Sequence, residues 1–89
     1  MMETEEINRL ISESKSFLDD YRIYGKMVSD AIDALSRVQD LVSDPTEDHL
    51  REALDIVNKL SDQMGPFRGY VPTFAENLDK IQQWLREKT

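Results

Sequence analysis

The fold is decided by residues 7–42, which read INRLISESKSFLDDYRIYGKMVSDAIDALSRVQDLV. Side chains spaced alternately three and four residues apart in this stretch are apolar, with Ser14 as the one exception. This spacing is the heptad pattern of a helix that packs lengthwise against other helices. The members of the series are Ile7, Leu10, Ser14, Phe17, Tyr21, Tyr24, Val28, Ala31, Leu35, Val38 and Val42. The pattern predicts one continuous helix over about residues 4–43, with Thr4 as its N-cap.

The apolar stripe of this expected helix is narrow in its first half and wide in its second half. Beside the series stand Glu13 and Asp20 early in the stretch. The equivalent later positions are apolar: Met27, Ala34 and Leu41. A narrow stripe suits one partner helix, whereas a wide stripe must be covered by two. We therefore expect the second half in a bundle core and the first half in a seam.

Gly25 lies in the middle of the series and admits two interpretations. A glycine inside a helix costs about 1 kcal/mol relative to alanine, but no proline or polar cluster stands beside it to form a loop. The first interpretation is a continuous helix, bent at Gly25. The alternative is a chain that folds back there into a monomeric four-helix bundle.

Turn signals divide the rest of the chain into two shorter helices. Asp44 followed by Pro45 is typical of a helix start, with aspartate as the N-cap and proline in the first helical position. Gly65 and Pro66 end that helix, and Thr73 caps the next one. The sequence predicts an all-α fold in a single domain, residues 1–89. A long N-terminal helix (about 4–43) and two shorter antiparallel helices (about 45–64 and 73–88) form a helical bundle.

Two short helices cannot cover a first helix that would be about 60 Å long. The uncovered half would leave a bare apolar strip, which usually marks an interface in a soluble protein. We therefore expect a homodimer in which this strip pairs with a second copy. The predicted interface residues are Ile7, Leu10, Ile11, Phe17, Leu18, Tyr21 and Tyr24. On the opposite, polar face of the same stretch, Ile23 is the one apolar side chain.

The net charge of −7 is concentrated in the first half of the chain. Residues 1–48 hold twelve acids and five bases, while residues 49–89 hold six of each. This distribution argues against nucleic acid or an anionic membrane as a partner and leaves a basic protein partner open. Cysteine is absent, which excludes disulfides and thiolate metal sites. With no signal segment and no run of 18 apolar residues, we expect a cytoplasmic protein.

No catalytic, cofactor-binding or metal-binding group is expected. His49 is the one histidine, and its place in a first helical turn indicates a surface residue rather than a ligand. The acidic pairs at 19–20 and 30–33 lack the glycine and terminal glutamate of a calcium loop, so we interpret them as solvated helix surface.

The loop between the two shorter helices is more apolar than a surface loop usually is. Its candidate binding residues are Phe67, Arg68, Tyr70 and Val71. The aromatic side chains either fold over the end of the bundle or present a hydrophobic contact, anchored by Arg68, to another protein.

The first functional interpretation is a non-enzymatic, self-associating protein-protein interaction module. A second rests on Arg9, Lys26 and Arg37 along the first helix, followed by Arg51-Glu52 and then Gln82 or Gln83. In this layout of one long and two shorter helices the chain resembles the all-helical chorismate mutases, which form intertwined dimers. The resemblance implies that the basic side chains bind substrate carboxylates and that the glutamate and glutamine complete the pocket.

A third interpretation is an acidic inhibitor that occupies the nucleic-acid-binding groove of a basic partner.

Overall fold

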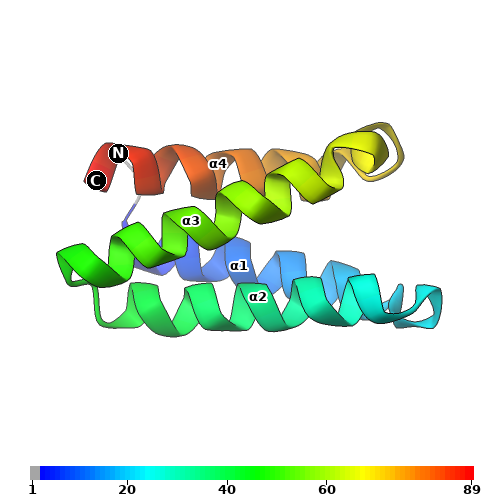
Figure 1. Cartoon of the computed structure of the whole chain (residues 1–89), viewed down its shortest axis with the longest axis horizontal. Helices are drawn as coiled ribbons and strands as arrows, with labels where there is room; N and C mark the ends of the chain where they lie inside the picture. The colour runs from blue at the N-terminus through cyan, green and yellow to red at the C-terminus, as the bar shows by residue number, and fades with distance from the viewer. Residues whose placement is uncertain (1–2) are drawn as a thin grey trace.

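The computed structural model describes residues 3–89, and over these residues it contains four α-helices and two short 3₁₀-helices (Figure 1). The elements in chain order are α1 (Thr4–Asp19), η1 (Arg22–Tyr24), α2 (Lys26–Ser43), α3 (Glu47–Met64), η2 (Gly65–Tyr70) and α4 (Pro72–Lys88). The expected all-α fold is confirmed.

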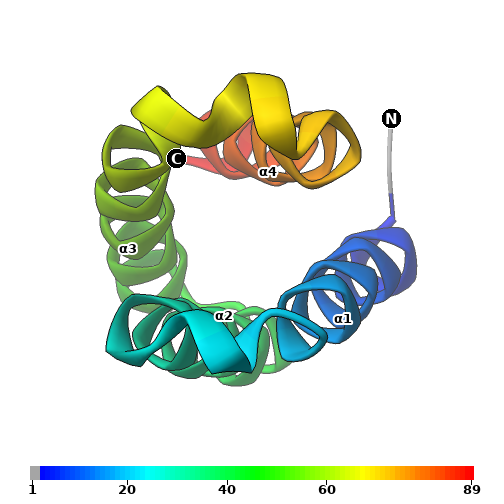
Figure 2. The ribbon, with the colours of Figure 1, turned by 90° about the vertical axis from the view of Figure 1, so that its right-hand side faces the viewer.

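Successive helices run antiparallel, and α1 also packs against α4, so that the four helices enclose one core (Figure 2). They contain 16, 18, 18 and 17 residues. At 1.5 Å per residue each helix is about 24–27 Å long, so each apolar face is covered over its whole length. The molecule measures 35 × 21 × 20 Å.

The prediction of one continuous helix over residues 4–43 is wrong, because the chain folds back between α1 and α2. α1 ends at Asp19, and Gly25 adopts φ +103°, a backbone conformation that favours glycine. Folding back buries the apolar stripe of α1 within the same chain, which stabilises it by about 25 cal/mol per Å² of apolar surface. The two shorter helices begin and end within two residues of the predicted bounds.

The fold-back places most of the predicted interface in the chain's own core. Five of the seven expected interface residues pack there: Ile7, Leu10, Ile11, Phe17 and Leu18. The expected bare strip is therefore wrong for these five side chains, because α2 and α4 cover α1. Tyr21 and Tyr24 remain exposed.

The one polar member of the heptad series is accommodated inside the core. Ser14 is fully buried, and its Oγ donates a hydrogen bond of 2.8 Å to the carbonyl oxygen of Leu10, one turn earlier. A buried hydroxyl without such a partner would be costly, so this local bond explains why serine is tolerated there.

Polar side chains join neighbouring helices at the edge of the core. Gln39 on α2 accepts from Lys15 Nζ at 3.1 Å and donates to Ser12 Oγ at 2.9 Å, both on α1. Between α3 and α4, Gln82 Nε2 donates to Asn58 Oδ1 at 2.6 Å. Because hydrogen bonds need short, directed contacts, these pairs help to fix how far each helix is shifted along its neighbour.

The helix starts differ from the sequence prediction in which residue acts as the cap. Thr46, rather than Asp44, caps α3: its hydroxyl accepts from the His49 N–H at 3.1 Å. α4 begins at Pro72, which has no N–H to satisfy, so Thr73 lies inside the helix. α1 likewise begins with Thr4, and Glu3 precedes it.

Leu18→Ala should lower the free energy of unfolding by about 2–5 kcal/mol, because Leu18 is 5% exposed and its loss leaves a cavity in the core. The matched control is Ile23→Ala, which lies five residues later and should change stability by less than about 0.5 kcal/mol. Urea denaturation followed by circular dichroism measures both variants. Equal effects of the two substitutions would contradict the fold-back of α1.

Candidate functional site

The large apolar side chains that remain exposed lie at one end of the bundle. The α1–α2 and α3–α4 connections are both at this end, on the right of Figure 1, and both face the viewer in Figure 2. Among residues 3–89, the exposed large hydrophobic side chains are Tyr21, Ile23, Tyr24, Met27, Phe67 and Tyr70. We call these six residues the aromatic end. It unites the last part of the predicted interface with the predicted binding loop.

A row of rings connects the core to the aromatic end. Phe74 at the start of α4 is buried, and its ring lies 6.1 Å from that of Phe17 on α1. The Phe17 ring lies 5.0 Å from Tyr21, which in turn lies 5.9 Å from Tyr24. Centroid separations of 4.5–7 Å are typical of favourable aromatic pairs. The exposed tyrosines are therefore held in place by packing that begins inside the bundle.

The predicted binding loop forms the short helix η2 rather than irregular backbone. Tyr70 is 84% exposed and Phe67 is 42% exposed, so these aromatic side chains do not fold fully over the bundle end. Val71 packs against the core, and Arg68 forms an ion pair with Asp79 on α4. The arginine and the valine thus fasten η2 to the bundle, and the rings of Phe67 and Tyr70 are presented to solvent.

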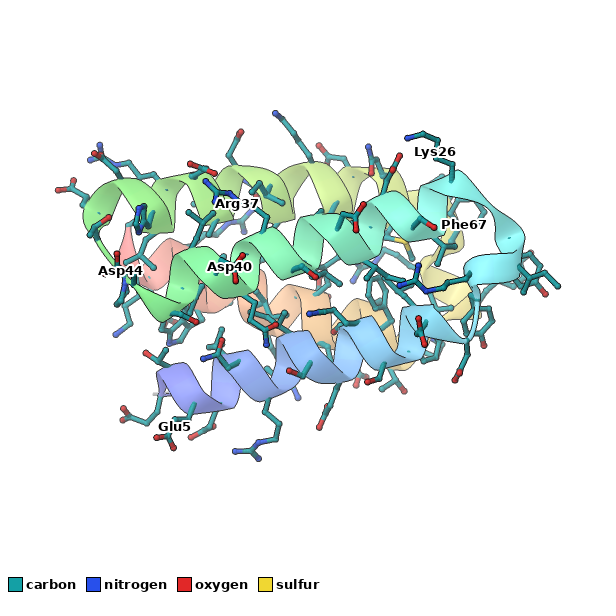
Figure 3. The ribbon with its side chains drawn as sticks, turned by 90° about the horizontal axis from the view of Figure 1, so that it is seen from below. Glu5, Lys26, Arg37, Asp40, Asp44 and Phe67 are labelled. Atoms are coloured by element: carbon teal, nitrogen blue, oxygen red, sulfur yellow. The ribbon has the colours of Figure 1, made fainter. Side chains whose placement is uncertain are left out.

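Charges around the aromatic end are close to balanced. Arg22 pairs with Asp19, and Lys26 Nζ lies 2.9 Å from Asp30 Oδ2. The halves of the helices nearest this end, with their connections, comprise residues 12–34 and 56–80 and hold eight acids and six bases. The rest of the chain holds ten acids and five bases. We call this half of the bundle, which is opposite the aromatic end, the acidic end. Figure 3 shows Glu5 and Asp44 towards the acidic end, opposite Lys26 and Phe67.

The residues that carry the chorismate-mutase resemblance do not gather at one place. Arg37 Nη2 lies 2.9 Å from Glu52 Oε2, an ion pair between α2 and α3. Lys26 pairs with Asp30 at the start of α2, and Gln82 bonds to Asn58 between α3 and α4. A dianion site needs several cationic groups that converge on one cavity, whereas these side chains lie in separate parts of the bundle.

Two shallow hollows lie between helices. One, of about 220 Å³, is lined by side chains of α2 and α3 that include Ala31, Ala34 and Leu60. The other, of about 200 Å³, lies beside Lys15, Asp19 and Arg22. Neither hollow is lined by Arg37, Glu52 or Gln82, so neither forms the pocket that the resemblance implies.

The structure places His49 at the start of α3, where its Nδ1 faces the carbonyl oxygen of Asp44. Over residues 3–89, no three His, Asp or Glu side chains gather in a way that could hold a metal ion. In the same part of the chain, no helix is both long and apolar enough to cross a membrane.

Comparison of the chain with protein-family models, with curated proteins and with solved structures finds no match. Both stretches that contribute to the aromatic end were candidates from the sequence, but Ile23 and Met27 were not among the predicted residues. For Ile23 a signal existed, since it is the one apolar side chain on an otherwise polar face.

A double-mutant cycle tests the row of rings. Phe17→Ala, Tyr21→Ala and the double variant should show a coupling of about 0.5–1.5 kcal/mol in the free energy of unfolding, because the two rings contact each other. Urea denaturation of the three variants and the parent chain gives this quantity. Additive effects, within about 0.3 kcal/mol, would show that the exposed tyrosines are not anchored through Phe17.

Proposed function

We propose that this protein is a non-enzymatic interaction module that binds a protein surface through its aromatic end. The observation that carries the proposal is the gathering of the exposed large apolar side chains at that one end of the bundle. Scattered exposed hydrophobic residues need no explanation, but a cluster on one face usually marks a contact site.

The size of the aromatic end supports this proposal. Its four aromatic residues, Tyr21, Tyr24, Phe67 and Tyr70, are 37%, 74%, 42% and 84% exposed. At about 200 Å² for an aromatic residue, they leave roughly 470 Å² of surface in water. Ile23 and Met27 add further apolar area. The largest apolar patch on a typical monomer covers about 300–600 Å² and is often functional.

The chemistry of the aromatic end also suits a protein partner. Tyrosine is enriched at protein interfaces because its ring is buried on binding while its hydroxyl keeps a hydrogen-bond partner. The arginines of the ion pairs Arg22–Asp19 and Arg68–Asp79 lie on η1 and η2, beside the aromatic residues in sequence, and polar residues are common at the rim of an interface. Neither sign of charge dominates, which favours an apolar contact over attraction to a polyanion or polycation.

The two other interpretations have less support. The enzyme interpretation requires basic and amide side chains to converge, and Arg37, Lys26 and Gln82 each bond to a different neighbour instead. The acidic-inhibitor interpretation has the acidic end in its favour. Bases are interspersed there, however, and Arg51 pairs with Glu47, which weakens any resemblance to the dense charge of a nucleic acid.

Photo-crosslinking tests the proposed contact surface. Benzoylphenylalanine placed at Tyr24 or at Tyr70 should give a discrete adduct in cells or at high protein concentration, because these side chains would lie within an interface. The control is the same group at Glu5, an exposed position at the opposite end, which should give no such adduct. Adducts identified by mass spectrometry that form equally from Glu5, or that fail to form from Tyr24 and Tyr70, would overturn the proposal.

A further inference from the structure

The α1–α2 turn carries apolar residues at the spacing of a helix, although the turn lies outside both α-helices. Tyr21 and Tyr24 lie in the turn, yet they continue the three-and-four spacing of α1 into α2 without a shift. An ordinary turn has no reason to keep the apolar register of the helices on either side of it. In a straight helix, both tyrosines would stand on the same apolar stripe as Phe17 and Val28.

The backbone of the turn is already close to helical except at Tyr21 and Gly25. Asp20 has φ −68° and ψ −14°, and Arg22–Tyr24 form the 3₁₀-helix η1. Tyr21, at φ −111° and ψ 14°, is a modest departure. Gly25, at φ 103° and ψ −162°, is the large one. A change of backbone conformation centred on Gly25 would therefore join α1 and α2 into a single helix.

We propose that the chain forms a dimer by exchanging α1, with α1 and α2 joined through Gly25 into one continuous helix in each copy. In this dimer, α1 of one copy packs against α2 and α4 of the other, as it does within one chain in the closed bundle. The proposal rests on the proposed function, since it names the partner that covers the aromatic end: a second copy of this chain.

Exchange keeps the contacts that hold the closed bundle together. The bonds of Gln39 to Lys15 and Ser12, and the ring contact of Phe17 with Phe74, form between the two copies instead of within one. Domain exchange is a low-cost route to a dimer for this reason. The exchanged dimer then differs from two closed monomers mainly in the backbone conformation of the α1–α2 turn and in the contacts of the residues near it.

The exposed residues around the turn favour a second copy of this chain as the partner that covers the aromatic end. A straightened α1–α2 helix places the turns of the two copies side by side at the centre of the dimer, where the two aromatic ends face each other. Tyr21, Ile23 and Tyr24, which are exposed in the closed bundle, then lie beside the same residues of the other copy. The roughly 470 Å² of exposed aromatic-residue surface on each copy, with Ile23 and Met27, approaches the ~800 Å² per partner of a standard interface.

The charge distribution agrees with this arrangement. The half of the bundle nearest the aromatic end has eight acids and six bases, so the surfaces that meet repel each other weakly. The acidic ends point outward, and since each bundle is 35 Å long they lie roughly 70 Å apart, far beyond the ~8 Å screening length of physiological salt.

A distance measurement tests the exchange directly. The chain contains no cysteine, so Arg9→Cys and Asp40→Cys allow specific spin labelling at two exposed positions. In the closed bundle the two labels are close, because their neighbours Asn8 and Gln39 are hydrogen bonded at 3.5 Å. In the continuous helix they are 31 residues apart along one axis, which is about 46 Å. Labelled chain is refolded at high concentration with a tenfold excess of unlabelled chain, so that only distances within one chain are observed.

The expected result is a dimer by light scattering in which double electron-electron resonance shows a distance near 46 Å. A dimer with the short distance alone would overturn the exchange but leave the aromatic end as an interface. A monomer at all concentrations would also overturn it, and the crosslinking from Tyr24 and Tyr70 then judges the proposed function separately.

A pair of glycine variants provides a matched control. Gly25→Ala disfavours the φ of +103° in the closed turn and favours a helix through this position, so it should lower the dissociation constant of the dimer at least tenfold. Gly65→Ala should leave the constant unchanged, because it lies outside the turn and an added Cβ meets nothing within 4 Å. Tyr24→Ser should raise the constant, because it removes a ring from the centre of the dimer. An equal effect of Gly25→Ala and Gly65→Ala would contradict the proposal.

Discussion

The arrangement of the four helices depends on the backbone conformation of one residue, Gly25. Its positive φ reverses the chain between two helices whose apolar stripes are in register, and this reversal allows α1 to cover the groove between α2 and α4. In a single chain without the reversal, α2 and α4 would expose the faces that Ile7, Ile11 and Leu18 now cover. In an 89-residue chain, where burial is limited by size, that loss would remove a large part of the core.

The same reversal explains why the exposed apolar residues lie where they do. Along the helices, each apolar face has a neighbouring helix to cover it. At the end of a bundle no further element follows, so side chains of the connections are covered only by one another. Tyr24 and Tyr70 are largely exposed for this reason. Tyr21 is less exposed, and its ring packs against that of Phe17. The opposite connection carries Asp44 and Thr46, whose polar groups serve in the turn and in the cap of α3.

The sequence predicted well those elements whose limits are set locally. α3 and α4 were predicted within two residues, because Pro45 and the pair Gly65-Pro66 disrupt helices by their own covalent structure. The break at Gly25 was predicted only as the alternative to a continuous helix, because a lone glycine is tolerated in a helix and the apolar register continues through it. What decides the break is the burial of α1, which involves residues of α4 more than 50 positions away and leaves no local signal.

The candidate site shows the same division between local and long-range information. The sequence marked Tyr21, Tyr24, Phe67 and Tyr70 as candidate contact residues, but it assigned them to two surfaces. In a bundle with a long first helix, the tyrosines would lie on its side and η2 at a distant end. Only the antiparallel order of four helices brings both connections to the same end, and that order follows from the turn at Gly25.

The two interpretations of Gly25, a turn and a continuous helix, therefore correspond to two conformations that the chain can adopt in our proposal. A heptad series that runs in register through the turn fits a straight helix as well as a hairpin, since the side chains of α1 meet the same partners in the closed bundle and in the exchanged dimer that we propose. Within one chain, α1 reaches its partners at the effective concentration of a short tether, which is of the order of millimolar. Between two chains, it does so only at the actual protein concentration. The closed form is favoured by this difference, and the straight form by the helical preference of the turn and by the burial of its tyrosines.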